Sequence, residues 1–318
     1  MDKPGGLGIG RVLVTGGSGF VGRALREALG GGCVGTYCGR AFEGGVRYDA
    51  AVDAPGDLLD RVGGVSHAVI AHAIATPDAC AADPETARRV NVDSCAGLAR
   101  ACRARGIGVL FCSTELAFGG GVVREDRAGW SGYSEGDGPS PQTLYGRLKV
   151  EAERSILGAD AGAVVVRLGR VVSDAPGRGG LLDELARGLA RPGVMRVATD
   201  QRFCPIGVND AARAIALLLD RGVEGVVHVA GPSAVTRFEM AQRLRAAMGQ
   251  VQPEAALAEV EGVSIEAFAT PEPRPKDVSL RIDRLVETTG FRPEVWRGLV
   301  DRFAARWRPA IRTTTACR

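Results

Sequence analysis

The sequence has 318 residues, of which 45% are hydrophobic and 24% charged, and a formal net charge of +3. This length suffices for one large core, or for a main domain with a smaller companion. No apolar run approaches the roughly 18 residues of a membrane span, and no Lys/Arg cluster supports nucleic-acid binding. The first ten residues lack the apolar core of a signal peptide, so we expect a cytoplasmic protein without membrane or nucleic-acid partners.

The positions of the cysteines and lysines indicate which kinds of functional site the protein can contain. The eight cysteines include no CxxC pair, and the three histidines lie far from any paired-cysteine spacing, so we expect no metal site. We interpret the thiols as small, reduced core residues. Lysine occurs only at Lys3, Lys149 and Lys276, and the other 37 of the 40 basic residues are arginine. Lys149 thus indicates a task for a compact ammonium group, although codon bias could also produce the arginine excess.

Apolar strand-like runs alternate with helical patterns in the first half of the chain. In chain order we predict a strand at 11–15, a helix at 21–29, strands at 33–37 and 67–73, a helix at 84–105, a strand at 107–113, a loop at 119–141, a helix at 142–157 and a strand at 163–169. This order is typical of an α/β protein, in which helices cover both faces of a parallel sheet.

The second half is less regular. We predict helices at 180–191, 209–220, 237–248 and 294–307, strands near 194–198 and 226–230, and a Pro-rich loop at 270–277. The chain is therefore divided into a first α/β unit at 1–170, whose core strands can continue past its end, a smaller region at 171–307 and a flexible tail at 308–318.

A glycine-rich segment, TGGSGFVG at 15–22, follows the first strand and opens the first helix. Gly16, Gly19 and Gly22 form a GxxGxxG spacing, and Gly17 with the last two forms an overlapping GxGxxG. Both spacings allow a tight turn and a close backbone approach to a pyrophosphate, which the helix N-terminus then faces. This placement between strand and helix predicts a dinucleotide site rather than a plain glycine turn.

The end of the second strand bears on the choice of dinucleotide. NAD sites commonly hold the ribose with an acid about 20 residues after the first glycine. Residues 36–40 read Thr-Tyr-Cys-Gly-Arg and contain no acid. Arg40 can instead neutralise a 2′-phosphate, so we predict NADPH as the cofactor, with NADH as the alternative in which Arg40 is a solvated surface residue.

Tyr145 and Lys149 lie four residues apart within the helix expected at 142–157, and therefore share one face. A nearby ammonium favours the tyrosinate and lowers the pKa of the phenol. The pair thus predicts a tyrosine that acts as a general acid or base near neutral pH. The alternative is that Tyr145 and Lys149 are neighbours on a helix surface and have no catalytic role.

Together these motifs resemble the extended short-chain dehydrogenase/reductases, and among them the dTDP-4-dehydrorhamnose reductase group. TGGSGFVG is similar to the cofactor loop of that family, and the segment 71–92, with Asn91-Val92, to its fourth strand and following helix. CSTELAFGG at 112–120 resembles the segment with the catalytic Ser/Thr, which falls on Thr114, and Tyr145–Lys149 matches YxxxK. The likeness extends into the second half at Asp200-Gln201 with Pro205, and at Arg274-Pro275 with Leu280 and Asp283.

The resemblance implies a Rossmann fold, a doubly wound parallel sheet, with a smaller C-terminal α/β substrate-binding region. It also implies an NAD(P)-dependent oxidoreductase in which Thr114, Tyr145 and Lys149 are catalytic. Tyr145 would protonate the oxygen of a sugar keto group, Thr114 would hydrogen-bond it, and Lys149 would hold the nicotinamide ribose. The implied cofactor contacts are Gly16, Gly19, Phe20, Val21, Gly22, Arg40, Asp49, His72, Ala73, Cys112, Tyr145 and Lys149. Of these, Asp49, His72, Ala73 and Cys112 could equally be packing residues.

The sequence departs from the family at the sugar site. Reductases of this group typically read Ser-Thr-Asp-Tyr after the fifth strand, where this chain has Glu115 and Leu116. Arg170 replaces an aromatic residue after the sixth strand. The loss of two aromatic contacts and the gain of a cation should change sugar recognition. The substrate contacts that we expect are Thr114, Glu115, Arg170, Gln201, Arg202 and Arg274, although any of these arginines could be a surface residue.

We therefore expect NADPH-dependent reduction of a keto group, at C4, on a nucleotide-activated deoxysugar. One alternative is a ketoreductase of free or aminocyclitol-linked sugars in specialised metabolism, such as antibiotic biosynthesis, which the Ala/Gly/Arg-rich composition would suit. Another is a non-catalytic NADP-binding regulatory subunit. An epimerase or dehydratase that recycles NAD is disfavoured by the missing acid. We expect a small-molecule partner and allow for a homodimer.

Overall fold

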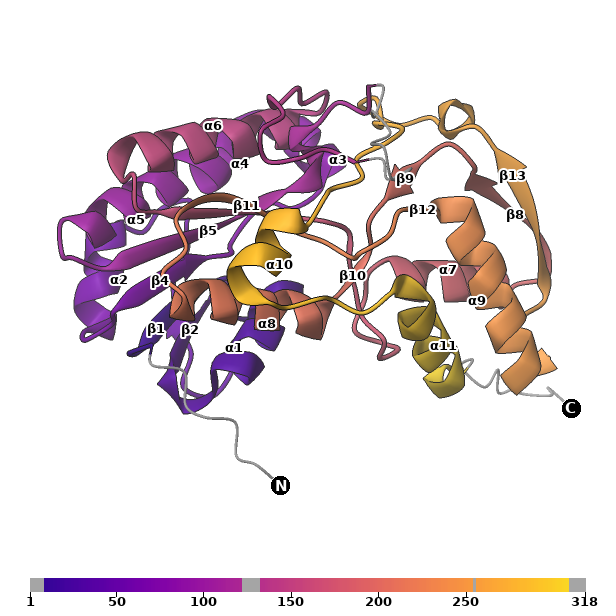
Figure 1. Cartoon of the computed structure of the whole chain (residues 1–318), viewed down its shortest axis with the longest axis horizontal. Helices are drawn as coiled ribbons and strands as arrows, with labels where there is room; N and C mark the ends of the chain where they lie inside the picture. The colour runs from indigo at the N-terminus through magenta and orange to yellow at the C-terminus, as the bar shows by residue number, and fades with distance from the viewer. Residues whose placement is uncertain (1–8, 122–131, 254–255, 309–318) are drawn as a thin grey trace, which may run out of the picture.

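The computed structural model describes residues 9–121, 132–253 and 256–308, which form two lobes side by side (Figure 1). The larger lobe contains a central sheet of seven strands. They are β1 (Val12–Thr15), β2 (Cys33–Tyr37), β3 (Val46–Arg47), β4 (His67–Ile70), β5 (Gly108–Thr114), β6 (Val164–Leu168) and β11 (Gly225–Val229). Their order is β11-β6-β5-β4-β1-β2-β3, and every pairing is parallel. The order reverses between β1 and β4, which is where such sheets bind their ligands.

Helices cover both faces of this sheet (Figure 1). On one face lie α2 (Pro55–Val62), α5 (Ser94–Arg103) and α6 (Leu144–Ala159), and on the other α1 (Phe20–Leu29), α8 (Val208–Asp220) and α10 (Asp283–Thr289). The strands are mostly apolar because both faces of the sheet are buried. The expected doubly wound α/β Rossmann fold is confirmed.

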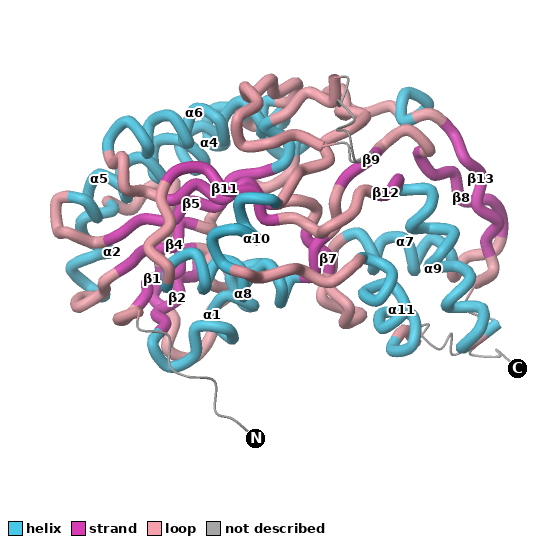
Figure 2. The backbone as a smooth tube through the Cα atoms, in the orientation of Figure 1, coloured by secondary structure: helices cyan, strands magenta, loops and turns pink. Residues whose placement is uncertain are grey.

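The smaller lobe packs α7 (Leu181–Leu189), α9 (Arg237–Val251) and α11 (Trp296–Arg306) around a separate apolar core. Its strands pair two by two, as Figure 2 shows. The pairs are β8 (Gly193–Ala198) with β13 (Ala258–Val263), β9 (Arg202–Phe203) with β12 (Val235–Thr236), and β7 (Val171–Val172) with β10 (Ile206–Gly207). The sequence pattern predicted only β8 and the three helices of this lobe.

The chain crosses between the lobes more than once. After β7 and α7 it returns to the large lobe, where α8 packs against α1 and β11 extends the sheet beside β6. Core elements of the first unit thus continue past residue 170, and a groove between the lobes is lined by residues of both halves of the sequence, among them Arg40 and Arg178.

The helix expected at 84–105 is interrupted, which corrects the prediction of one continuous element. The chain forms α3 (Pro77–Ala82), α4 (Pro84–Arg88), a π-helical turn (Arg89–Asp93) and then α5. The Ser94 and Cys95 side chains both donate to the Val90 carbonyl, and Asn91 turns inward. Such π-turns re-aim side chains and are frequent near functional sites.

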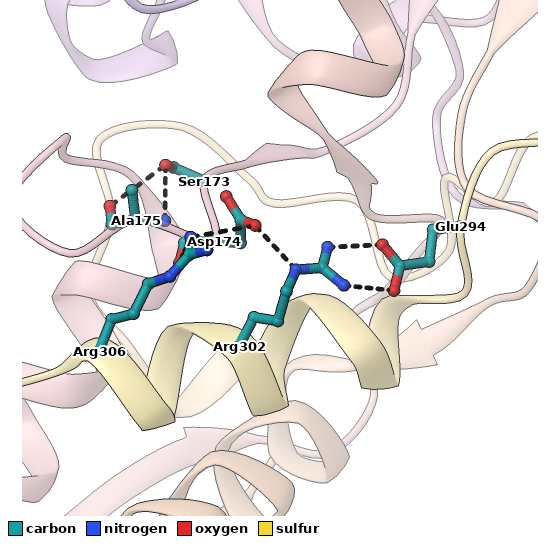
Figure 3. A network of polar contacts seen from close by, with 6 residues as sticks. All are labelled: Ser173, Asp174, Ala175, Glu294, Arg302 and Arg306. Carbon is teal, nitrogen blue, oxygen red and sulfur yellow. Dashed lines mark hydrogen bonds and ion pairs between the residues drawn. The ribbon is translucent and has the colours of Figure 1, made fainter. Parts of the chain in front are cut away.

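A network of ion pairs holds α11 against the segment that follows β7 (Figure 3). Arg302 donates two hydrogen bonds to Glu294, at 2.6 and 2.5 Å, and a third to Asp174 at 2.9 Å. Asp174 also pairs with Arg306 at 3.4 Å. A network of this kind fixes geometry more than a single exposed pair does.

The remaining predictions concern loops, termini and thiols. Residues 270–277 form a loop as expected, whereas 122–131 of the predicted loop and 309–318 of the predicted tail lie outside the described residues. Five of the seven described cysteines are buried, and all seven are free. Within the described ranges, no helix is long and apolar enough to cross a membrane.

Candidate active site

The glycine loop forms the tight turn that its spacing predicts. Gly16 adopts φ +70°, and a Cβ there would lie 2.9 Å from the backbone of His72 on the neighbouring β4 segment. A Cβ on Gly22 would lie 2.1 Å from the Gly16 carbonyl oxygen. Larger residues at either position would therefore push the loop, helix and sheet apart.

The N-terminus of α1 is open to an anion. Its N-cap is Gly19, which supplies no side-chain cap, and the first turn contains no acidic residue. The first amides of the helix, at Phe20 and Val21, thus join the positive end of the helix dipole at the carboxyl edge of β1. This cradle fits a dinucleotide pyrophosphate, as expected of residues 15–22.

Arg40 and Asp49 lie on the outer side of this cradle. Arg40 is exposed and lines a groove that it shares with other arginines, among them Arg23 and Arg178. Asp49 is half-buried, and its carboxylate accepts the backbone N–H of Ala51 at 3.1 Å. The groove concentrates positive charge. Asp49 stabilises its own turn through this hydrogen bond.

His72 has its side chain occupied inside the protein. Its Nδ1 lies 2.7 Å from Thr15 Oγ1 and its Nε2 2.8 Å from Ser94 Oγ, so the ring ties β1 to α5. Burial lowers the pKa of His72 to about 3, so the imidazole is neutral. The backbone of His72 passes directly beside Gly16.

Asn91 fixes the segment that continues from β4. Its side-chain oxygen accepts the Ile74 backbone N–H at 2.9 Å, and its amide donates to the Ile74 carbonyl at 3.1 Å. This two-way bond holds the residues after His72 and Ala73 in place along the cleft.

Thr114 and Tyr145 come together where β5 ends and α6 begins. Gly146 allows this approach, because a Cβ there would lie 2.2 Å from the Leu116 carbonyl oxygen. Thr114 Oγ1 accepts the Leu116 N–H at 3.2 Å, and the Thr114 hydroxyl lies close enough to the Tyr145 phenol to lower its pKa. Thr143 caps α6, so Tyr145 lies in the first turn, where the helix dipole favours a phenolate.

The structure corrects one electrostatic expectation about this pair. Burial raises the pKa of Tyr145, and Lys149 is not among the groups that lower it most. The Lys149 ammonium instead lies 4.2 Å from the centroid of the Phe111 ring, next to Cys95 and Cys112. Burial also lowers the pKa of Lys149. The ammonium of Lys149 thus lies over a ring of β5 rather than beside the phenol of Tyr145.

Glu115 and Arg170 form an ion pair beside Thr114. Glu115 Oε1 lies 3.3 Å from Arg170 Nη2, and the carboxyl group is buried whereas the guanidinium is 40% exposed. Burial raises the pKa of Glu115 to about 7, although the guanidinium opposes this. Two residues that depart from the family pattern are thus in contact, next to the expected reaction centre.

Comparison with known proteins identifies the family. A family model described as the RmlD substrate binding domain matches residues 10–308. The chain belongs to the RmlD substrate binding domain family. It is 30% identical to a dTDP-4-dehydrorhamnose reductase of Mycolicibacterium smegmatis over 93% of this chain and 85% of that protein. The predicted resemblance is confirmed, and the chain is an NAD(P)-dependent oxidoreductase.

Two further proteins are similar to this chain. A methionine adenosyltransferase 2 subunit beta of Danio rerio is 31% identical over 72% of this chain and 71% of its own length. The crystal structure of a dTDP-4-dehydrorhamnose reductase from Bacillus anthracis, in complex with NADP, superposes with a TM-score of 0.77. That match covers 93% of this chain and 98% of the other at 20% identity, and shows the shared fold.

A cavity in the smaller lobe brings together two of the expected substrate contacts and one further arginine. Gln201 and Arg274 line a cavity of about 230 Å³ together with Arg237. Arg237 pairs with Glu184 at 2.5 Å, and burial and the positive charges of Arg170 and Arg274 lower its pKa. Arg237 is the first residue of α9, where the helix dipole disfavours a cation, so its position in the sequence is unusual.

The other predicted contacts are placed as follows. Arg274 donates to Asp78 at 2.6 Å, but its buried Nη1 has no hydrogen-bond partner within the described ranges. Arg202 does not line this cavity and faces Asp277 at 3.8 Å. Cys112 lies buried at the end of β5. In the part of the chain that the structure describes, no three His, Cys, Asp or Glu side chains are grouped to hold a metal ion.

Proposed function

We propose that this protein uses NADPH to reduce a keto group, at C4, of a nucleotide-activated deoxysugar. The observation that carries the proposal is the Thr114–Tyr145 pair at the carboxyl edge of β5, across the switch point from the glycine cradle. When bound, NADPH supplies a hydride. Membership of the RmlD family and the sugar-nucleotide reductases among its relatives support this reaction class.

Tyr145 and Thr114 act on the oxygen of the keto group. Tyr145 holds a proton at Oη in the first turn of α6 and transfers it as negative charge develops on the substrate oxygen. The Thr114 hydroxyl is oriented by the Leu116 amide and stabilises the same oxygen. The near-complete burial of both side chains excludes water and strengthens these interactions.

Arg237 and Arg274 are proposed to contact the diphosphate of the substrate. Arg237 and Arg274 line one cavity, and their positive charges repel each other. An anion that binds between them would relieve this repulsion. The unpartnered Nη1 of Arg274 offers a further donor. Nucleotide 4-ketosugars should therefore be far better substrates than free or aminocyclitol-linked ketosugars. NADPH oxidation against a panel of both classes tests this. Equal rates with the free sugars would contradict the proposal that the substrate carries a nucleotide.

Replacing Arg40 by serine tests the choice of cofactor. We expect kcat/KM for NADPH to fall by about 10- to 100-fold, because a charge-assisted hydrogen bond to the 2′-phosphate is lost. The value for NADH should change little. Initial rates with both cofactors measure this, with the exposed Arg61→Ser as a control on the same lobe. A wild-type protein that prefers NADH would contradict the proposal.

A second candidate function is a regulatory subunit that binds the dinucleotide without turnover. The relative named methionine adenosyltransferase 2 subunit beta favours it. Against it stands the complete set of Thr114, Tyr145 and Lys149 in this chain. The substrate panel separates the two, because a regulatory subunit would bind NADPH and oxidise it with none of the sugars.

A further inference from the structure

The first turn of α6 is held by hydrogen bonds to two of its backbone amides. The first four N–H groups of a helix have no partner within the helix and need one from outside it. Thr143, the N-cap residue, accepts the N–H of Gly146 at 3.1 Å. The N–H of Leu144 donates to the carboxylate of Glu272 at 2.7 Å. Tyr145 therefore lies between two residues whose amides are tethered.

Glu272 reaches α6 from a distant part of the sequence, 128 positions beyond Leu144. The Glu272 side chain is 13% exposed, and its Oε2 is buried without a hydrogen-bond partner in the described ranges. The carboxylate also pairs with the exposed Arg147 at 3.4 Å. Because hydrogen bonds to an ionised acceptor are stronger than neutral ones, this mostly buried carboxylate should hold the Leu144 amide firmly.

The loop that contains Glu272 is stiff and is anchored beside the helix. Proline alternates with Glu272 and Arg274 over residues 271–275, and each proline fixes its own φ at about −65°. The Glu272 carbonyl accepts the Thr270 hydroxyl at 2.7 Å. Arg274 donates to Asp78 of α3 at 2.6 Å. The carboxylate thus approaches α6 from a loop that is held on both sides of it.

We propose that Glu272 is a positioning residue that keeps the first turn of α6, and with it Tyr145, in place at the reaction centre. The inference rests on the proposed function, in which Tyr145 is the proton donor. Proton transfer requires the phenol oxygen at hydrogen-bond distance from the substrate oxygen. A frayed first turn would let the phenol move away, and a displacement of about 1 Å can cost roughly 100-fold in rate.

This tether is separate from the proposed diphosphate contact. Arg274 lines the cavity of about 230 Å³ together with Gln201 and Arg237, whereas Glu272 is not among the described residues that line it. Loss of the Glu272 carboxylate should therefore slow the chemical step and leave the binding of substrate nearly unchanged.

Two substitutions of Glu272 test whether the hydrogen bond to Leu144 matters for the reaction. Glu272→Ala removes the acceptor, so kcat for ketone reduction should fall about 10-fold, less than the cost of a full ångström of displacement, with little change in KM. Glu272→Gln keeps an oxygen that can accept the Leu144 N–H and should recover most of the lost kcat. Glu151→Ala removes an exposed carboxylate from the same helix and should leave both constants unchanged.

Hydrogen exchange of the backbone amides gives a second measurement that needs no turnover. In the NADP⁺ complex of Glu272→Ala, residues 142–150 should exchange faster than in wild type, because the Leu144 amide has lost its partner. Glu272→Gln and Glu151→Ala should exchange as wild type does. Mass spectrometry of peptides from this segment measures the effect, and the thermal midpoint shows that the rest of the fold is intact.

Three results would overturn the proposal: a wild-type kcat in Glu272→Ala, a loss that falls on KM alone, or a Glu272→Gln variant no more active than Glu272→Ala. If Glu272→Ala fails to fold, Glu272→Ser replaces it, since a serine side chain is too short to reach the Leu144 amide. If the wild-type protein reduces no ketosugar, the proposed function is rejected and hydrogen exchange alone decides the role of Glu272. Unchanged exchange of residues 142–150 in Glu272→Ala would then overturn it.

Discussion

Tyr145→Phe is expected to lower kcat for ketone reduction by roughly 10²- to 10⁴-fold, the usual contribution of a positioned general acid. The substitution removes one oxygen atom that contacts Thr114 and leaves the aromatic ring in its buried place. NADPH affinity and the thermal midpoint should therefore stay close to wild type. Single-turnover NADPH oxidation separates the chemical step from cofactor binding.

A matched control is available for this substitution. The Tyr133 hydroxyl donates a hydrogen bond to the Gly121 carbonyl. The Tyr133 ring stacks on Phe118. Tyr133→Phe should keep nearly full activity. If Tyr145→Phe retains the wild-type rate with a substrate that the protein turns over, another group donates the proton and the role of Tyr145 is wrong.

The sequence was most informative where local pattern and burial agree. The strands β1, β2, β5 and β6 are short apolar runs because both faces of a parallel sheet are covered. The glycine loop was predictable for a similar reason, since the close approaches at Gly16 and Gly22 admit no side chain. The approach at Gly22 is local, whereas Gly16 meets the backbone of His72, but the glycine spacing marks both positions in the sequence.

Elements without a hydrophobic pattern escaped prediction. β13 is largely exposed, and β7, β9, β10 and β12 contain two residues each, too few for any periodicity. Their positions are set by pairing partners distant in the sequence.

Side-chain direction was the other limit on the candidate site. The i, i+4 spacing places Tyr145 and Lys149 on one face of α6 but does not fix where the ammonium points. The contact between Glu115 and Arg170 likewise depends on the β5–β6 register, which brings together residues 55 positions apart. The resemblance marked both residues as unusual, whereas their pairing required the fold.

A buried charge network beneath the reaction centre leads to the largest expected effect on stability. Glu153, one turn after Lys149 on α6, accepts three hydrogen bonds from Arg167 at 2.8 to 3.2 Å and one from Ser113. Arg167 lies in the middle of β6, and both charged side chains are 4% exposed. An arginine within an apolar strand signals such a partner, because a lone buried charge is not tolerated.

Glu153→Gln should destabilise the fold by about 3–5 kcal/mol, since it leaves the Arg167 charge buried and uncompensated. This is a large share of the roughly 5–15 kcal/mol that a typical domain has. The double variant Arg167→Met/Glu153→Met should recover most of the loss, because two apolar side chains can fill the site without a charge. Glu151→Gln lies on the same helix as Glu153 and breaks an exposed pair with Arg88 of α4, so it should cost at most about 1 kcal/mol. Urea unfolding of all four proteins measures these differences. A double variant no more stable than Glu153→Gln would show that the loss does not come from an uncompensated Arg167 charge.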